Sequence, residues 1–591
     1  MVSARRVGSS CVHLFALLAG FVFCCSGSTC EEPSALEDDT ALLDLRFEDD
    51  SALELLQRAA TKKEVSSHGA RQQSQSADIP LGVTSIYSRP AKFDALPESN
   101  FVPNSECGGG NCSQQVHITL GGPGEMVVSF ASSPDAETPA EVKFALAADW
   151  GLAREAAEGT TETYSQLMFW NPQLVNPAVK GRFDLSAEAE AKIRSTDTWA
   201  FDKETGKHYK AWKHMTAKQV VHEFDRGTVQ GKYKNPSEYY DSPALHTVVL
   251  KGLKPGQEYK YQVANDDRVF SFRMPEDGRK AFPFKVGVIS DVGQTPVSNS
   301  TFFGLAKMSP DVVVLSGDLS YADGYYHRWD TYGQLAEQLG AFVPVMSCPG
   351  NHEVGDGEAF VSYRIRYPMP FAASGSSDSS YWSRDMGPMH VISINSYAGT
   401  APGTSQFRWL SQDLQKYSRE RTPWLVVLMH VPFYNSNSGH LGEAKLQQEN
   451  IEDMLYQYGV NVVISGHVHS YERTFPTYHN KTHPCGLTYL NMGDAGNREG
   501  PYMDWLPGQK GASSPEWSAF REGSFGFGSL LIQNETHMHF TWQRNACFDH
   551  GQLSFDAENC STTRDNSEDK ASNSDDAWIV RSQLACENQR G

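Results

Sequence analysis

The sequence predicts an α/β domain preceded by an all-β sandwich domain. Two observations lead to this fold class. Between about residues 112 and 274, short segments alternate apolar and polar side chains and are separated by Gly/Pro turns, which is typical of a β-sandwich. From Phe284 onward, short apolar runs alternate with amphipathic helical segments, which indicates buried strands joined by helices.

The sandwich is predicted from short strands with a period of two residues. The turn Lys254-Pro-Gly256 separates two of them. The stretch at about 159–240 is long, aromatic and not clearly periodic, so we interpret it as an insertion within a sandwich domain that spans 106–280. The predicted strands are 115–119, 126–130, 246–250, 258–263 and 269–272.

The α/β domain is predicted to span 281–546. Its helices are clearest at 406–417 and 443–458, where apolar residues recur at helical spacing. Ligands of such sheets bind at the carboxyl ends of the strands, so these ends are the place to look for functional residues. The predicted strands are 284–290, 311–316, 342–347, 391–395, 424–429 and 460–465.

The charge balance excludes one class of partner. The 591 residues include 51 Lys+Arg and 71 Asp+Glu, which gives a net charge of −20. Because such a charge repels phosphate backbones, we do not expect nucleic acid as a partner. The hydrophobic fraction of 39% is typical of globular proteins, and the length predicts roughly two to four domains.

The N-terminus has the pattern of a secretory signal peptide. Two arginines precede an apolar run from Cys11 to Cys25, which small residues follow. The run is shorter than the roughly 20 residues that span a bilayer, so we predict that 1–27 is a signal peptide rather than a membrane anchor. No other segment of the sequence has the length and apolar character of a membrane span. The mature protein is expected to be secreted or to stay within the secretory or endolysosomal pathway, and the polar stretch 28–105 is interpreted as a leader or linker.

Secretion favours disulfides. Among the cysteines after the signal peptide, we predict only the local pair Cys107 and Cys112, while Cys348 best suits a free buried thiol. The acidic segment 547–591 contains further cysteines and is predicted to be an extension held by a disulfide. Sequons of the form N-x-S/T predict a glycoprotein, at Asn111, Asn299, Asn480, Asn534 and Asn559.

Several predicted strands of the α/β domain end in side chains that bind metals. A single Asp or His at a strand end is usually structural. Five strand ends that all carry such residues are hard to explain as hydrogen-bonded polar groups of the core, because unpaired buried charges are costly. Carboxylate, phenolate, imidazole and amide groups suit hard or borderline cations. In chain order, the strand ends carry Asp291; Asp318 and Tyr321; Asn351, His352 and Glu353; His430; and His467 and His469.

The order of these blocks resembles the purple acid phosphatases of the calcineurin-like metallophosphoesterase superfamily. The family blocks D-x-G, G-D-x-x-Y, G-N-H-D/E, V-x-x-H and G-H-x-H all have counterparts, and the likeness extends over about Gln115 to Asn545. The resemblance implies a fibronectin type III-like sandwich followed by a catalytic βαβαβ metallophosphoesterase sandwich. The matching segments are 291–293, 317–321, 350–353, 427–430 and 466–469.

The resemblance also implies a dinuclear metal centre of Fe(III) and a divalent ion, which would be iron, zinc or manganese. Tyr321 is the discriminating residue, because related phosphoesterases without this tyrosine lack the charge-transfer colour. The implied ferric ligands are Asp291, Asp318, Tyr321 and His469, and the implied divalent ligands are Asp318, Asn351, His430 and His467, with Asp318 bridging the two ions.

The implied reaction is hydrolysis of small phosphate monoesters by a hydroxide bound to this centre, as in a secreted acid phosphatase. His352 and His440 are the candidate proton donors to the leaving group, and we interpret Glu353 and Glu443 as residues that orient them. Plant-type members commonly have two adjacent histidines where this chain has Gly439-His440. This difference leaves the protonation of the leaving group and the substrate preference open.

Other functions remain open at this stage. A phosphodiesterase or nucleotide pyrophosphatase would use the same metal ligands, and a non-catalytic scaffold would retain the fold without turnover. The sandwich is expected to be structural rather than an independent binding domain, and a homodimer is possible by resemblance.

Overall fold

We describe a computed structural model of the chain. It describes residues 82–88, 93, 95–96, 112–167, 200–202, 207–209, 239–355, 358–506, 515–545 and 575–581, all within one compact unit that begins at Asp78. The predicted signal peptide, most of the predicted leader and most of the C-terminal extension lie outside these residues. Among the residues described, no helix combines the length and apolar character needed to cross a membrane.

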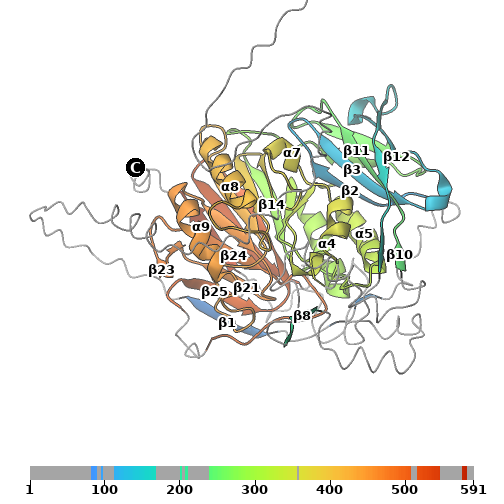
Figure 1. The fold of residues 1–591 in the computed structure, drawn as a ribbon. Helices are drawn as coiled ribbons and strands as arrows, with labels where there is room; N and C mark the ends of the chain where they lie inside the picture. Colours follow the sequence, from blue (N-terminus) through green and yellow to red (C-terminus); the bar gives the residue numbers. More distant parts are fainter. Residues whose placement is uncertain are drawn as a thin grey trace, which may run out of the picture. The chain divides into compact units, whose positions relative to one another are not determined.

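The first domain is a sandwich of two antiparallel sheets, as predicted (Figure 1). The described part of the predicted insertion contributes β6 to one sheet, and its β7 (Ser165–Leu167) pairs with β10 (Tyr239–Asp241). Alternate residues of each strand face a shared core that includes Val128, Tyr261 and Phe272. In spatial order, the sheets are β2 (Gln114–Leu120), β3 (Met126–Ser132), β11 (Ala244–Leu250) and β6 (Thr160–Glu162); and β13 (Phe270–Arg273), β12 (Glu258–Val263), β4 (Glu141–Leu146) and β5 (Glu155–Glu158).

The second domain contains two larger mixed sheets. Each contains a group of neighbouring parallel strands, which antiparallel strands extend on both sides in the first sheet and on one side in the second. One sheet is ordered β1 (Val83–Ser88), β25 (Ser518–Gly523), β21 (Tyr471–Thr474), β24 (Thr488–Met492), β20 (Val462–Ser465), β19 (Trp424–Met429), β18 (Met389–Ile394), β17 (Trp382–Met386). The other is ordered β16 (Val345–Ser347), β15 (Val312–Leu315), β14 (Phe284–Ile289), β26 (Gly526–Ile532), β27 (His537–Arg544), β28 (Asp575–Val580).

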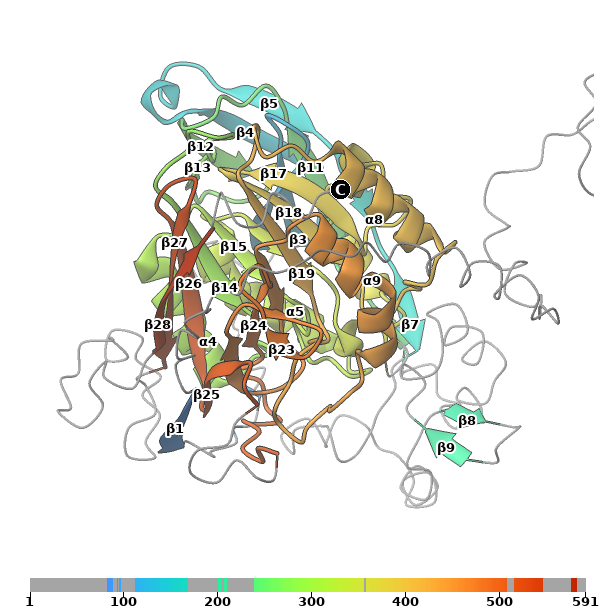
Figure 2. The ribbon, with the colours of Figure 1, turned by 90° about the vertical axis from the view of Figure 1, so that its left-hand side faces the viewer.

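Helices cover the outer faces of these sheets (Figure 2). The two faces of β19 belong to different cores: Leu425 and Val427 pack with α8 (Ser405–Lys416) and α9 (Lys445–Gln457), whereas Val426 and Leu428 join the core that also contains β14. Because side chains alternate along a strand, this division places one sheet against the other with helices outside. The remaining helices are α4 (Pro296–Met308), α5 (His327–Gly340), α6 (Val361–Arg366) and α7 (Phe371–Ser374).

Three segments contradict a specific expectation from the sequence. The strand expected at 342–347 begins only at Val345, because the N–H groups of Phe342 and Val343 bond to Leu339 and prolong the end of α5. Strand β1 lies within the stretch expected to be a leader, yet it pairs in parallel with β25. Strand β28 lies within the expected extension and pairs with β27. Asp575 at its start accepts hydrogen bonds from Tyr471 and Arg473, both at 2.6 Å, so an ion pair fixes this strand.

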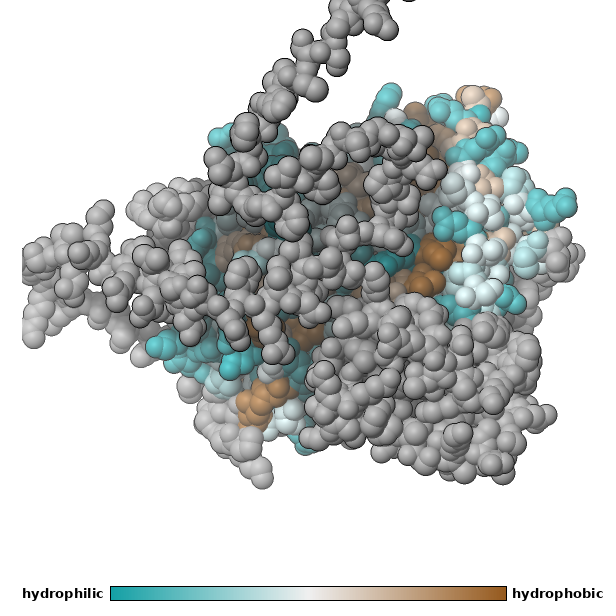
Figure 3. Space-filling view, in the orientation of Figure 1, coloured by the Kyte–Doolittle hydropathy of each residue, from teal (hydrophilic) through white to brown (hydrophobic). Residues whose placement is uncertain are grey.

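The described cysteines test two predictions, and the exposed apolar residues do not identify a dimer interface. Cys348 is free and buried, as predicted. Cys112 is disulfide-bonded, but its predicted partner Cys107 lies outside the described residues. Exposed large apolar side chains such as Leu152 and Leu446 lie on separate elements, and on the face seen in Figure 3 the visible described surface mixes hydrophilic residues with small hydrophobic patches. Because these exposed apolar side chains form no single patch among the described residues, the homodimer stays a prediction.

A buried histidine in β18 predicts a pH-dependent stability. His390 lies between two carboxylates, with Nδ1 2.6 Å from Asp385 and Nε2 2.8 Å from Asp413. Burial alone would lower the pKa of His390, but these hydrogen bonds raise it from 6.5 to about 9. The charged histidine is thus expected to stabilise the fold by about 3 kcal/mol below pH 6.5, and this contribution is lost as the pH rises through about 9.

This expectation is tested by melting temperatures of the wild type and His390→Gln between pH 6 and about 10. The difference between the two proteins should be large at pH 6 and should shrink above pH 9. An equal difference at both ends of the range would mean that His390 is neutral in the folded protein.

Candidate metal centre

The predicted ligands come together because they follow parallel strands. Asp291 follows β14, Asp318 follows β15, and Asn351 follows β16 in one sheet, while His430 and His467 follow β19 and β20 in the other. The carboxyl ends of parallel strands share one edge, so the face-to-face packing of the two sheets brings both edges to one place.

The backbone at this edge is strained at several of these positions. Asp291, Asp318, Tyr321 and His467 have φ angles of 56°, 54°, 52° and 68°, which L-residues with a side chain rarely adopt. Such strain persists where the surrounding structure enforces it and is typical of functional sites. A Cβ atom at Gly350 would collide with the carboxylate of Asp318, so this glycine of the motif is required by the close approach of a ligand side chain.

One group of donor atoms consists of Asp291, Tyr321 and His469, all buried. The Tyr321 hydroxyl lies 3.2 Å from Asp291 Oδ1 and 3.0 Å from His469 Nε2, and the last two atoms are 3.3 Å apart. Ligands bound at about 2.1 Å and at right angles around one cation lie about 3 Å apart, so these three atoms fit a shared coordination sphere. Two hard oxygen donors in this set fit a trivalent ion.

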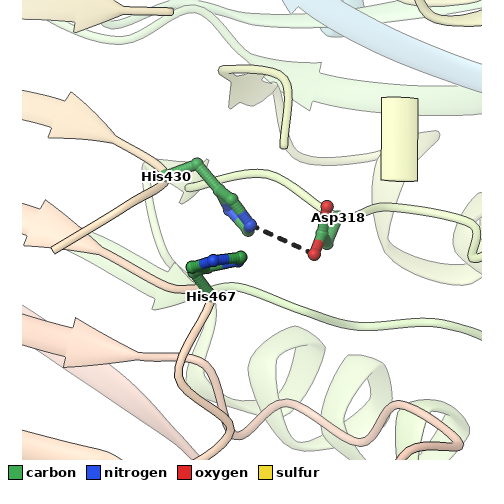
Figure 4. A group of neighbouring side chains, drawn as sticks. All are labelled: Asp318, His430 and His467. Carbon is green, nitrogen blue, oxygen red and sulfur yellow. Dashed lines mark ion pairs between the residues drawn. The ribbon is translucent and has the colours of Figure 1, made fainter. Parts of the chain in front are cut away.

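A second group of donor atoms consists of Asp318, Asn351, His430 and His467. His430 Nε2 lies 3.1 Å from both Asp318 Oδ2 and Asn351 Oδ1. The possible ligand atoms of Asp318, His430 and His467 all lie within 4.8 Å of one another, and Figure 4 shows the two imidazoles facing the carboxylate.

The hydrogen bonds of His430 support its role as a metal ligand. Its Nδ1 lies 2.7 Å from the carbonyl oxygen of Ser316 and therefore carries a proton, which leaves Nε2 as the ring nitrogen that could coordinate a metal. The buried Oδ2 atom of Asp318 accepts no hydrogen bond from any described residue. Because a buried carboxylate oxygen without a donor is costly, a cation at this position satisfies the arrangement.

The electrostatics of the site also call for a cation. Burial opposes ionisation of Asp318, but the nearby imidazoles of His430 and His352 hold its pKa below the ordinary value. Burial and the charges of Asp291 and Asp318 raise the pKa of the Tyr321 phenol well above 10. A phenolate at Tyr321 therefore requires a strong positive charge beside it.

The structure corrects the predicted role of Glu353. This carboxylate does not orient His352. It accepts hydrogen bonds from the backbone N–H groups of Asp318, Leu319 and Gly350 at 2.9, 2.8 and 2.7 Å. Glu353 thus holds together the two loops that carry Asp318 and Asn351. This role was not predictable from the sequence, because two of the three bonds are made to backbone groups of a loop distant along the chain.

Asp323 orients His352 in its place. Its carboxylate bonds to His352 Nδ1 and also pairs with Arg498. His352 Nε2 lies 3.8 Å from Asp318 and 3.7 Å from Glu499, and its ring lies 4.0 Å from the ring of Tyr321. Asp323, Arg498 and Glu499 were missed by the sequence analysis.

His440 lies on the other side of the site, beside the second group of donors. Its Nδ1 is 3.2 Å from Oε1 of Glu443, the residue expected to orient it. The same carboxylate contacts His467 Nε2 at 2.8 Å, and the rings of His440 and His467 lie 3.8 Å apart. Glu443 therefore links the candidate proton donor to a candidate metal ligand.

Comparison with known proteins agrees with this geometry. Three family models match in order: "Purple acid Phosphatase, N-terminal domain" over 113–274, "Calcineurin-like phosphoesterase" over 284–471, and "Iron/zinc purple acid phosphatase-like protein C" over 486–553. Probable purple acid phosphatase 20 of Arabidopsis thaliana is 40% identical over 341 residues, which cover 54% of this chain and 77% of that protein. This chain belongs to the purple acid phosphatase family.

Further relatives extend the comparison. Phosphoenolpyruvate phosphatase of Allium cepa is 36% identical over 345 residues, covering 54% of this chain and 70% of that protein. The structure of a purple acid phosphatase from yellow lupin (Lupinus luteus) seeds superimposes with a TM-score of 0.58 at 20% identity and covers 82% of this chain and 77% of that one. The predicted fold class is confirmed. As a purple acid phosphatase, the chain is an acid phosphatase that acts on phosphate esters, and the family implies a dinuclear metal centre.

Proposed function

We propose that the chain hydrolyses phosphate monoesters at a centre of one ferric and one divalent ion. Asp291, Asp318, Tyr321 and His469 would hold the ferric ion, and Asp318, Asn351, His430 and His467 would hold iron, zinc or manganese in the divalent state. The observation that carries the proposal is the convergence of the Tyr321 hydroxyl, Asp291 Oδ1 and His469 Nε2 within 3.0–3.3 Å of one another. When bound, the ions supply an activated water nucleophile and neutralise charge on the phosphoryl group.

Two histidines are the candidate proton donors to the leaving alcohol. His352 and His440 flank the ligands from two sides, one beside Tyr321 and the other beside His467. Asp323 fixes Nδ1 of His352 and Glu443 fixes Nδ1 of His440, so each imidazole keeps its Nε2 for another partner. We assign His440 as the principal proton donor, because Nε2 of His352 is flanked by Asp318 and Glu499.

The cellular context is part of the proposal. The chain would enter the secretory pathway by its signal peptide at 1–27. A leader to 105 would precede the sandwich and catalytic domains, and the acidic tail would follow them. Asn480 and Asn534 are exposed at turns and suit glycosylation, whereas Asn299 lies within α4 and accepts a hydrogen bond from Gln338.

The proposal is tested on the purified protein by metal content, visible spectrum and relative rates on a monoester and a diester of the same alcohol. We expect about two metals per chain, one of them iron, a purple absorption band, and faster hydrolysis of the monoester. A colourless protein with two other metals would contradict the ferric assignment. Faster hydrolysis of the diester would favour the phosphodiesterase function, and a metal-free, inactive protein would favour a scaffold.

Replacing His440 with alanine is expected to slow esters of poor leaving groups most. Loss of a general acid should lower kcat on an alkyl phosphate by about 10²-fold and on a nitrophenyl phosphate by less than about 10-fold, because a nitrophenolate leaves without a proton. His537→Ala at the exposed start of β27 is the matched control and should change neither rate. Equal losses on both substrates would argue against a proton donor at His440.

A further inference from the structure

Gly439, which stands where plant-type members commonly have a histidine, lies against the side chain of Tyr502. A Cβ atom at Gly439 would lie 2.7 Å from Cδ2 and 3.2 Å from Cε2 of the Tyr502 ring. The backbone of Gly439 is not in the left-handed region, so conformation does not require glycine there. Glycine is required there by lack of space, because the Tyr502 ring occupies the volume that any side chain at position 439 would enter.

Tyr502 is held firmly between the two halves of the site. Its N–H donates to the carbonyl of His469 at 2.7 Å, and its own carbonyl accepts from Asn437 Nδ2 at 3.1 Å. Its ring stacks on the imidazole of His469, with centroids 4.4 Å apart and planes at 24°. The ring therefore cannot move away from position 439 without losing contacts to a candidate metal ligand and to the loop that carries His440.

The hydroxyl of Tyr502 reaches the candidate proton donor. It lies 3.4 Å from His440 Nε2, while Glu443 holds Nδ1 of the same imidazole at 3.2 Å. The hydroxyl also lies 3.5 Å from Glu499 Oε2, to which it can donate while it accepts from His440. His440 is thus held at both ring nitrogens, and its Nε2–H stays oriented until a leaving-group oxygen replaces the tyrosine as its acceptor.

We propose that Tyr502 is a positioning residue for His440 and that Gly439 and Tyr502 form a matched pair, in which the tyrosine ring occupies the space of the histidine that plant-type members commonly have at position 439. This inference rests on the proposed function of His440. The steric contact between Gly439 and Tyr502, however, can be tested without an activity assay.

The steric part is tested by a double-mutant cycle of melting temperatures on the full-length protein. Gly439→Ala should lower the melting temperature by at least about 2 °C, because its methyl group meets the tyrosine ring. The same change in the background of Tyr502→Ala should have little effect, since the ring is gone. An equal effect of Gly439→Ala in both backgrounds would overturn the matched pair.

The positioning part is tested by Tyr502→Phe, which keeps the ring and removes only the hydroxyl. We expect kcat on an alkyl phosphate to fall about 10-fold while KM, metal content and the visible spectrum stay unchanged, and a nitrophenyl phosphate should be nearly unaffected. Tyr478→Phe, which removes a tyrosine bond to Asp453 at 2.7 Å in β22 (Thr477–Tyr478), is the matched control. Unchanged kcat on the alkyl ester would overturn the positioning role.

The double variant Gly439→His with Tyr502→Ala adds a rescue. It recreates the adjacent histidines that plant-type members commonly have, so it should recover more alkyl-phosphate activity than Tyr502→Ala alone, and no recovery would count against the exchange of roles. If the wild type itself proves inactive, the proposed function fails, whereas the melting-temperature cycle still decides the matched pair.

Discussion

Replacing Asp318 with alanine is expected to remove both metal ions and to abolish hydrolysis. Asp318 is the one ligand assigned to both ions, and its carboxylate lies 3.1 Å from His430 Nε2 and close enough to Tyr321 to raise the pKa of the phenol. Its other oxygen accepts a hydrogen bond from the backbone of His352 at 2.9 Å, so the side chain also fixes the loop of a candidate proton donor. We expect a loss of kcat/KM of at least about 10³-fold.

The measurement is the number of metal ions per chain, together with kcat/KM on a nitrophenyl phosphate. Asp318→Asn retains the shape and the hydrogen bond from His352 but not the charge, so it separates metal binding from loop structure. Asp378→Ala, at an exposed pair with Arg364, is the matched surface control. Retention of two metal equivalents in Asp318→Ala would rule out the bridging assignment.

The positions of the candidate metal ligands were predictable because they follow from the fold class. Each of them stands at or just after the end of a strand whose apolar run is visible in the sequence, and parallel strands place such ends on one edge. Asp291 and His467 are far apart in the chain and follow strands of different sheets, but the packing of the two sheets makes them neighbours, with the backbone N–H of His467 2.9 Å from Asp291 Oδ2.

The surrounding residues were not predictable in the same way. Asp323, Arg498 and Tyr502 lie in irregular loops, where no periodicity links a residue to its partner. Glu353 was assigned to His352 because the two are adjacent in sequence, whereas its bonds go to backbone groups of a distant loop. Adjacency in sequence says little about contact when the backbone turns sharply between two side chains.

The two outlying strands escaped prediction for a related reason. Strand β1 and strand β28 lie within polar stretches and join sheet edges formed elsewhere in the chain. Their pairing depends on the edge that they meet rather than on their own pattern of apolar residues.

Tyr321→Phe is expected to bleach the purple band completely while iron remains bound and part of the activity survives. The charge-transfer colour requires a phenolate on the ferric ion, and phenylalanine has no oxygen to supply. The ring itself is retained, so its packing at 4.0 Å from the ring of His352 should be preserved. Because Asp291, His469 and Asp318 remain, we expect iron affinity and kcat to fall by about 10- to 100-fold rather than to vanish.

The visible spectrum and the iron content must be measured on the same sample, since loss of iron alone would also remove the colour. Tyr397→Phe is the matched control: this tyrosine donates to Asn351 Oδ1 at 3.3 Å on the divalent side, so its loss should leave the band in place. A bleached band with iron retained in the ferric state assigns Tyr321 as the ferric ligand, because the variant then lacks only the phenolate. An unchanged band in Tyr321→Phe would place the chromophore on another tyrosine and would require a different ferric site.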